Sequence, residues 1–160
     1  MIKICFVCHG NICRSPMAEY VMKHKLKLND LDKKIEVVSR ATSYEEQGND
    51  MHYGTKDMLD EHNIPYKKHK ATRLEKNDYD KFDHIICMDS ANVSNTLRLF
   101  DLTESHKIYK LLKNKDVKDP WYTGNFIETY EDIDKGTDTL IGMLKIEMWF
   151  YGIFSREKRR

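Results

Sequence analysis

Four short apolar segments alternate with longer helical ones along this chain, and that alternation limits its possible folds more than any other feature. The short segments lie at 2–7, 35–39, 84–88 and 107–112. Apolar runs of this length are typical of buried β-strands. Strands that alternate with helices predict a parallel sheet with helices on both faces. The expected fold class is therefore α/β, a single domain built on a four-stranded parallel sheet.

The helical segments are predicted from residue spacing and from start and stop signals. Ser15 is expected to cap a helix that has Pro16 in its first turn and ends near Leu28. Further helices are predicted over 50–62, 90–100 and 129–153, with a polar helical turn near 75–80 and a loop over 118–125.

The most apolar helical stretch, 140–154, is interrupted by Lys145 and Glu147. We interpret it as a buried helix face, with a helix lying on a membrane surface as the alternative. No run of about 18 uncharged apolar residues is present, and the residues after Met1 do not resemble a signal peptide. We therefore expect one domain over 1–154, a charged tail over 155–160, and no membrane partner.

Charge and cysteine content limit the partners and the cellular compartment that we expect for this chain. The 160 residues include 27 Lys and Arg and 26 Asp and Glu, which gives a formal charge of +1. The chain therefore has no overall positive potential that would attract the phosphate backbone of a nucleic acid. The basic tail is expected to be a solvated helix end. Three of the four cysteines (Cys5, Cys8, Cys13 and Cys87) fall within nine residues, which is poor spacing for a secreted disulfide framework. A reducing, cytoplasmic setting is expected.

The segment from Cys8 to Pro16 follows the first predicted strand and leads into the first predicted helix, where ligands bind in parallel α/β sheets. Inward-turned backbone N–H groups and the helix N-terminus would form a concave anion site. Arg14 adds a planar donor suited to two phosphate oxygens, and the same field stabilises a Cys8 thiolate as a nucleophile. An ordinary strand-to-helix turn is the alternative, but it would bury Arg14 without an anion at high cost.

The remaining residues of this loop have supporting tasks. Gly10 permits close backbone approach, and Ser15 is placed to donate a hydrogen bond to the Cys8 sulfur. The expected phosphate-binding residues are His9, Gly10, Asn11, Ile12, Cys13, Arg14 and Ser15.

Residues 7–19 (Val-Cys-His-Gly-Asn-Ile-Cys-Arg-Ser-Pro-Met-Ala-Glu) resemble the signature of the low-molecular-weight protein tyrosine phosphatases. Cys87-Met88-Asp89 with Asn92, and Asp119-Pro120-Trp121-Tyr122, are similar to two further segments of that family, so the resemblance covers most of the chain. It implies a flavodoxin-like fold and hydrolysis of phosphotyrosine in proteins or peptides, and of aryl phosphates, with inorganic phosphate as product. In that reaction Cys8 forms a phosphocysteine, Arg14 binds the phosphate, and Asp119 acts as general acid and base.

The resemblance also implies supporting residues. Trp121 and Tyr122 would form one wall of a slot for the tyrosine ring, and Tyr44 the opposite wall. Asn11, Ser15, Ser39 and His69 would hold the loop in shape. Cys13 is expected to form a reversible disulfide with Cys8. No metal and no cofactor are implied, and we expect a monomer, with a weak dimer as the alternative.

Some residues depart from the family pattern and leave the peptide preference open. His9 stands where a small or apolar residue is more common, Arg40 follows Ser39, and 49–52 lacks the usual prolines and arginine.

Three other functions compete with this prediction. A thiol-dependent arsenate reductase shares the fold and the loop but needs two further cysteines downstream, where only Cys87 remains. A protein-arginine phosphatase carries Thr where this chain has Ile12. A phosphopeptide-binding module without turnover would not need Cys8, Arg14 and Asp119 together.

The spacing of Cys5 and Cys8 superficially matches a pair of metal ligands, but Cys5 lies inside a predicted strand and no second pair of cysteines with this spacing exists.

Overall fold

The computed structural model describes residues 1–157, with side chains described through residue 152, and it confirms the predicted α/β class. The strands are β1 (Ile2–Cys8), β2 (Ile35–Ala41), β3 (His84–Cys87) and β4 (Ile108–Lys110). The helices are α1 (Arg14–Leu28), α2 (Tyr53–Glu61), the 3-10 helix η1 (Lys76–Lys81), α3 (Ser90–Leu99), α4 (Pro120–Thr123) and α5 (Phe126–Glu157).

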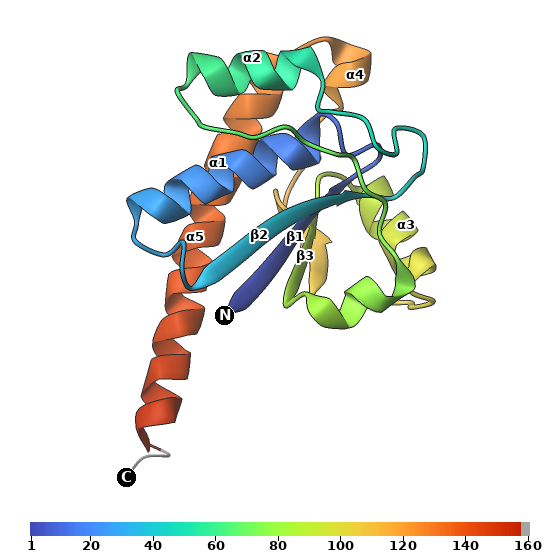
Figure 1. The fold of residues 1–160 in the computed structure, drawn as a ribbon. Coiled ribbons are helices and arrows are strands. Elements are labelled where there is room, and N and C mark those ends of the chain that lie inside the picture. Colours follow the sequence, from blue (N-terminus) through green and yellow to red (C-terminus); the bar gives the residue numbers. More distant parts are fainter. Residues whose placement is uncertain (158–160) are drawn as a thin grey trace.

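The four strands form one parallel sheet in the order β2-β1-β3-β4 (Figure 1). β1 is central: it pairs with β2 from Ile2↔Ile35 to Cys8↔Ala41, and with β3 from Ile4↔His84 to Val7↔Cys87. All the strands run the same way, so their carboxyl ends meet at one edge of the sheet, and Cys8 lies at that edge.

Alternate residues of β1 pack into two different hydrophobic clusters. Ile4, Phe6 and Cys8 pack with residues of α1, α2 and α5, whereas Cys5 and Val7 pack with the cluster that contacts α3. This period of two is what a strand covered on both faces requires. It also puts Cys5 and Cys8 in different clusters, so their spacing in sequence does not bring the two thiols together.

Two predicted helix starts were wrong. Ser15 does not cap α1: Cys13 occupies the N-cap position with no side-chain cap, and the Ser15 hydroxyl is bonded to Cys8 and Asn11 instead. The helix predicted from residue 50 begins at Tyr53, because His52 is its N-cap and accepts from the backbone N–H of Gly54 through Nδ1. The Asp50 carboxylate before it accepts from the backbone N–H groups of Met51 and His69.

The segment predicted as a loop over 118–125 contains the short helix α4. Asp119 is its N-cap and accepts from Trp121 N, with Pro120 in the first turn. Gly124 ends it with φ 69°, a left-handed conformation that glycine adopts without strain.

The last helix was also predicted incompletely. α5 begins at Phe126, and its side chains at Leu140, Ile141 and Leu144 are buried as expected. Farther along, Trp149 is 62% exposed and Tyr151 72% exposed, because the helix continues past the sheet that covered its earlier turns (Figure 1). The predicted buried face is therefore wrong for this end.

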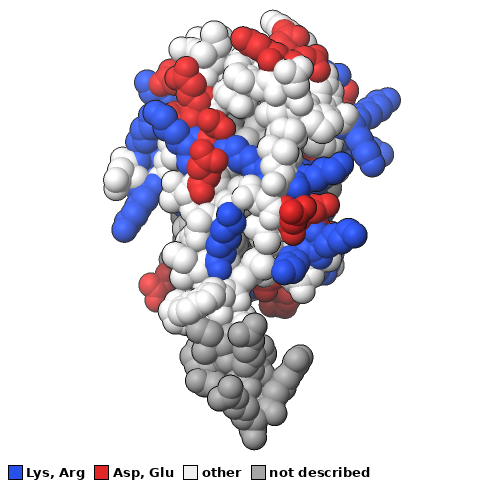
Figure 2. Space-filling model, turned by 90° about the vertical axis from the view of Figure 1, so that its left-hand side faces the viewer, with Lys and Arg blue, Asp and Glu red and all other residues white. Residues whose placement is uncertain are grey.

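The predicted boundary between a domain ending at 154 and a charged tail falls inside α5, which continues to Glu157. Residues 158–160 of that tail lie outside the described residues. Within 1–157, no helix is long and apolar enough to cross a membrane. On the face shown in Figure 2, basic and acidic side chains lie interspersed, in keeping with the balanced composition.

Candidate active site

The loop between β1 and α1 curls around the Cys8 sulfur. Asn11 N donates to Cys8 Sγ at 3.3 Å, and Ser15 Oγ lies 2.9 Å from the same sulfur. The Ser15 oxygen accepts from Asn11 Nδ2 at 2.8 Å, and its hydroxyl hydrogen has two acceptors in reach, the Cys8 sulfur at 2.9 Å and the more distant Arg40 carbonyl at 3.5 Å. Two donors therefore converge on Cys8, an arrangement that stabilises a thiolate.

Asn11 is the fixed point of this loop. It is fully buried and has a left-handed backbone with φ 59°, which asparagine tolerates better than most residues. Its Oδ1 accepts from Thr72 N at 3.0 Å, and its backbone carbonyl accepts from His69 Nε2 at 2.7 Å. The structure thus brings Asn11, Ser15 and His69 together within one network of hydrogen bonds.

Ser39 extends the network to a buried carboxylate. Its hydroxyl accepts from Asn11 Nδ2 at 2.9 Å and donates to Glu19 Oε1 at 2.6 Å. Glu19 is 7% exposed and is paired with Lys23 at 2.6 Å. A continuous chain of hydrogen bonds therefore runs from Glu19 to the Cys8 sulfur. Sequence reasoning assigned Glu19 no task, although its place one helical turn after Ser15 could have suggested one.

His69 is itself held in place by a carboxylate. Asp50 Oδ1 accepts from His69 N at 2.9 Å, while Asp50 Oδ2 pairs with Lys56 at 2.6 Å. Burial alone would raise the pKa of Asp50, but the hydrogen bonds from Lys56, His69 and Met51 outweigh it and lower that pKa to about 2. Asp50 therefore remains ionised across the physiological range.

Arg14 is 2% exposed and is satisfied by two carboxylates and a carbonyl. Its Nη1 donates to Asp89 Oδ2 at 2.6 Å and to the Val117 carbonyl at 2.9 Å, and its Nη2 to Asp119 Oδ2 at 3.3 Å. Burial opposes the charge, but Cys8, Asp89 and Asp119 outweigh it and raise the pKa of Arg14. A permanent cation therefore faces the sulfur.

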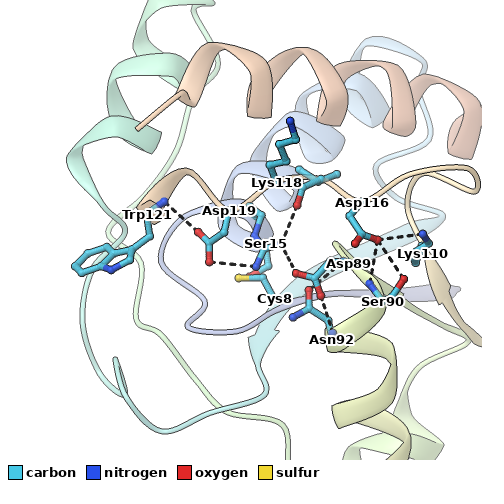
Figure 3. A network of polar contacts seen from close by, with 12 residues as sticks. Cys8, Ser15, Asp89, Ser90, Asn92, Lys110, Asp116, Lys118, Asp119 and Trp121 are labelled. Carbon is cyan, nitrogen blue, oxygen red and sulfur yellow. Dashed lines mark hydrogen bonds and ion pairs between the residues drawn. The ribbon is translucent and has the colours of Figure 1, made fainter. Parts of the chain in front are cut away.

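Asp89 does two things at once. It caps α3, accepting from Asn92 N at 2.7 Å (Figure 3). It also fixes the guanidinium of Arg14. The sequence pattern pointed to Cys87-Met88-Asp89 and Asn92 but gave neither polar residue a task. Their roles depend on contacts between residues 14 and 89, which no local pattern reveals.

A cavity of about 100 Å³ opens above the loop. It is lined by Cys8, His9, Gly10, Ile12, Cys13, Arg14, Glu45, Glu46, Asp119, Trp121 and Tyr122. Three widely separated segments of the chain therefore meet here. Trp121 is 58% exposed and stands beside the His52 ring, with 5.8 Å between ring centroids.

The cavity differs from the prediction at the wall that was assigned to Tyr44. Glu45 and Glu46 line it, and Glu45 pairs with His9 at 2.9 Å, but Tyr44 is not among the lining residues. The Tyr44 ring lies against Arg73 instead, with the guanidinium carbon 4.4 Å from the ring centroid. Sequence reasoning missed both glutamates, because nothing local ties them to the loop.

The other three cysteines differ from Cys8 in their surroundings. Burial, aided by the nearby Cys8, raises the pKa of Cys13 to about 12, and burial raises that of Cys87 to about 12. Burial also raises the pKa of Cys5 well above its usual value. These three remain thiols near neutral pH, whereas Cys8 has donors aimed at its sulfur.

Comparison with known proteins matches this geometry to one family. The family model described as low molecular weight phosphotyrosine protein phosphatase matches residues 3–148. The low molecular weight protein-tyrosine-phosphatase PtpA of Staphylococcus saprophyticus is 40% identical over 152 residues, covering 90% of this chain and 94% of that protein. The PtpA of Staphylococcus aureus strain MRSA252 is 38% identical over 146 residues, covering 88% of this chain and 92% of that protein.

Solved structures agree with the sequence relatives. The low molecular weight protein tyrosine phosphatase SP-PTP of Streptococcus pyogenes is similar with a TM-score of 0.84 and 41% identity, covering 90% of this chain and 93% of that one. YfkJ of Bacillus subtilis is similar with a TM-score of 0.88 and 34% identity, covering 92% and 96%. With the fold, the loop and these likenesses in agreement, the chain belongs to the low molecular weight phosphotyrosine protein phosphatase family, whose members are cysteine-dependent protein tyrosine phosphatases.

Proposed function

We propose that this phosphatase hydrolyses phosphotyrosine in proteins or peptides through a phosphocysteine on Cys8, with Arg14 binding the phosphate and Asp119 transferring protons. The observation that carries the proposal is the shared cavity. Cys8, Arg14 and Asp119 all line it, although Asp119 is more than a hundred residues away in sequence. Nucleophile, anion receptor and acid within one small cavity are the parts that phosphoryl transfer needs.

In the first half of the reaction the phosphate of the substrate enters the loop. It takes the position at Arg14 Nη2 that Asp119 holds at 3.3 Å, which frees the Asp119 carboxyl to face the leaving oxygen. The Cys8 thiolate attacks phosphorus as the bond to the tyrosyl oxygen breaks. Protonated Asp119 gives its proton to that oxygen, so the neutral phenol leaves.

In the second half of the reaction, water hydrolyses the phosphocysteine and regenerates the free enzyme. Ionised Asp119 takes a proton from water, whose oxygen attacks phosphorus, and the bond to sulfur breaks. Cys8 leaves as a thiolate, helped by the Ser15 hydroxyl 2.9 Å away. Inorganic phosphate is the product, and Asp119 is protonated again for the next cycle. The chain from Glu19 through Ser39 and Asn11 holds the Ser15 hydroxyl in the position that this step uses.

Aromatic walls are proposed to select the tyrosine ring. Trp121 and Tyr122 stand at the mouth of the cavity, so a phenyl ring can stack there while its phosphate reaches Cys8. A phosphoserine side chain is too short to span that depth. Tyr44 remains the proposed opposite wall, and reaching the cavity would require its ring to leave Arg73.

A thiolate nucleophile must stay reduced, so we propose a cytoplasmic protein that acts as a monomer on phosphotyrosine proteins, with nucleic acid and membrane not among its partners. The balanced charge of the chain supports the exclusion of nucleic acid. The domain over 1–154 is proposed to carry the whole activity.

A substrate panel tests the proposed function. Matched peptides carrying phosphotyrosine, phosphoserine or phosphoarginine are compared with arsenate supplied together with a thiol reductant, all in the presence of EDTA. We expect kcat/KM for phosphotyrosine to exceed that for the other peptides by roughly 10²-fold or more, because only it fills the aromatic slot. The matched variant is Ile12→Thr, since Ile12 lines the cavity and crowds a branched guanidinium. Preference for phosphoarginine or arsenate in the unmodified protein would overturn the assignment.

Cys13 is proposed to protect the nucleophile from oxidation. Hydrogen peroxide converts the Cys8 thiolate to a sulfenic acid; the Cys13 sulfur then attacks it, loses its proton and forms the disulfide as water leaves. In Cys13→Ala no disulfide forms, so excess peroxide oxidises the sulfenic acid further to a sulfinic acid, which dithiothreitol does not reduce. After treatment with excess peroxide, dithiothreitol should therefore restore the activity of the wild type and of Cys87→Ala, but not of Cys13→Ala. Equal recovery of all three would contradict the proposal.

A further inference from the structure

A second cavity, of about 660 Å³, lies at the β4 edge of the sheet between α3 and α5, and it shares no lining residue with the active site. Its walls are mainly apolar, with Val93 from α3 facing Leu140 and Met143 from α5. Gly136 brings α5 close to the chain after β4, since a Cβ there would meet Leu111 Cγ at 2.6 Å. A cavity of this volume can hold a small organic molecule.

The polar groups of this cavity are hydroxyls and cations. Ser90, Ser94, Lys110 and Lys113 line it, and no carboxylate does. Lys113 is exposed and has no hydrogen bond or ion pair within the described part of the chain. Lys110 Nζ pairs with Asp116 Oδ1 at 3.0 Å. An apolar interior beside two ammonium groups fits a ligand with an apolar body and a single negative charge.

Two lining residues also hold the segment that carries Asp119. Asp116 Oδ1 accepts from Ser90 N at 3.1 Å, from Ser90 Oγ at 3.2 Å and from Lys110 Nζ at 3.0 Å (Figure 3). The hydrogen bond from Lys110 lowers the pKa of Asp116, so its carboxylate stays charged. These contacts tie the chain at 116–119 to the start of α3.

The tied segment contacts the catalytic arginine directly. The Val117 carbonyl accepts from Arg14 Nη1 at 2.9 Å, and Val117 N donates to the Met88 carbonyl at 2.8 Å. Asp119 follows two residues later and pairs with Arg14. Asp116 lies one residue before Val117, which is hydrogen-bonded to Arg14, and three residues before Asp119, so a displacement of Asp116 is passed to both the acid and the phosphate-binding group.

We propose that this cavity binds a small amphipathic carboxylate, with its apolar body between α3 and α5 and its carboxylate at Lys113 and Lys110, and that its occupancy lowers turnover. The bound carboxylate competes with Asp116 for Lys110, which loosens segment 116–119 and misplaces Asp119. The binding part stands on the cavity alone, whereas the effect on turnover rests on the proposed function.

Amide NMR shifts on the full chain test the binding part, with decanoate as the probe. Saturating inorganic phosphate is present to keep the catalytic loop occupied. We expect saturable shifts around Ser94, Leu111 and Thr139. Decanol, which lacks the charge, should bind about fivefold more weakly. Shifts confined to residues 8–15, or none that saturate below the micelle concentration, would overturn the proposal.

Variants separate the apolar and the charged contacts. Thr139→Trp fills the cavity from an exposed helix position and should abolish decanoate binding. Lys113→Gln should weaken decanoate about fivefold and leave decanol unchanged. Lys115→Gln is the matched control, since Lys115 pairs with Asp132 and does not line the cavity. Equal decanoate affinity in Thr139→Trp and in wild type would refute the site.

Turnover of a phosphotyrosine peptide, whose leaving group needs the proton of Asp119, tests the coupling. Saturating decanoate should lower kcat about fivefold at constant KM, and Asp116→Asn should keep binding decanoate while losing this response. A rise in KM alone would mean binding at the active site and would contradict the coupling. If the unliganded protein shows no turnover at all, the proposed function fails, and the NMR titration still decides the binding site.

Discussion

Cys8→Ser is expected to reduce turnover of a phosphotyrosine peptide by at least about 10³-fold while leaving phosphate binding intact. The serine oxygen would stay within reach of Asn11 N and Ser15 Oγ, which now meet the sulfur at 3.3 and 2.9 Å. A hydroxyl is not ionised near neutral pH, however, so the nucleophile is lost while the anion site remains. Single-turnover kinetics with the peptide, and calorimetry with inorganic phosphate, measure the two effects separately.

Cys87→Ala is the matched control for the Cys8 variant. Cys87 is a fully buried thiol of β3, and its only side-chain partner in the described residues is Thr96 Oγ1 at 3.7 Å, outside the catalytic cavity. It should lose some stability from the smaller side chain but keep its turnover. Full activity in Cys8→Ser, or an equal loss in Cys87→Ala, would show that the reaction does not pass through a phosphocysteine on Cys8.

The arrangement of the loop residues could be predicted because these residues are close together in the sequence. Cys8, Asn11, Arg14 and Ser15 belong to one strand-to-helix connection, and the strand that precedes them fixes where they lie. A motif of this kind carries its own geometry, so its residue types and spacing suffice. The predicted N-cap at Ser15 was wrong because the Ser15 hydroxyl is part of the site. It is bonded to Cys8 and Asn11 rather than to the first turn of the helix.

Residues brought to the site by the fold could not be predicted in the same way. Asp89 holds Arg14 from the start of α3, and Glu45 and Glu46 line the cavity from the loop after β2. Strand order and register decide which of the many acidic residues come close to the loop, and neither is visible in the local pattern. α4 did have readable signals in Asp119 and Pro120, but four residues are too few for helical periodicity.

The two carboxylates that accept hydrogen bonds from Arg14 differ in how tightly they are held. Asp89 is bonded at 2.6 Å and also caps a helix, so it is a fixed partner that orients the guanidinium. Asp119 is at 3.3 Å on a short helix at the cavity mouth, so it is the partner that an incoming phosphate can displace. This difference supports the proposal that Asp119, rather than Asp89, transfers protons.

Asp119→Asn should therefore lower kcat/KM for a phosphotyrosine peptide by roughly 10²- to 10⁴-fold, with a much smaller loss of kcat/KM on p-nitrophenyl phosphate. The comparison uses kcat/KM because it reports the step in which the leaving group departs and not the later hydrolysis that both substrates share. The nitrophenolate leaves without a proton, whereas the tyrosyl oxygen needs one. Asparagine keeps an oxygen for Trp121 N, which Asp119 Oδ1 now accepts at 3.1 Å, so α4 stays capped and the aromatic wall stays in place. Asp119→Ala removes that cap as well, so any additional rise in KM relative to Asn reports the position of Trp121. Equal losses on both substrates would mean that Asp119 positions the wall and does not protonate the leaving group.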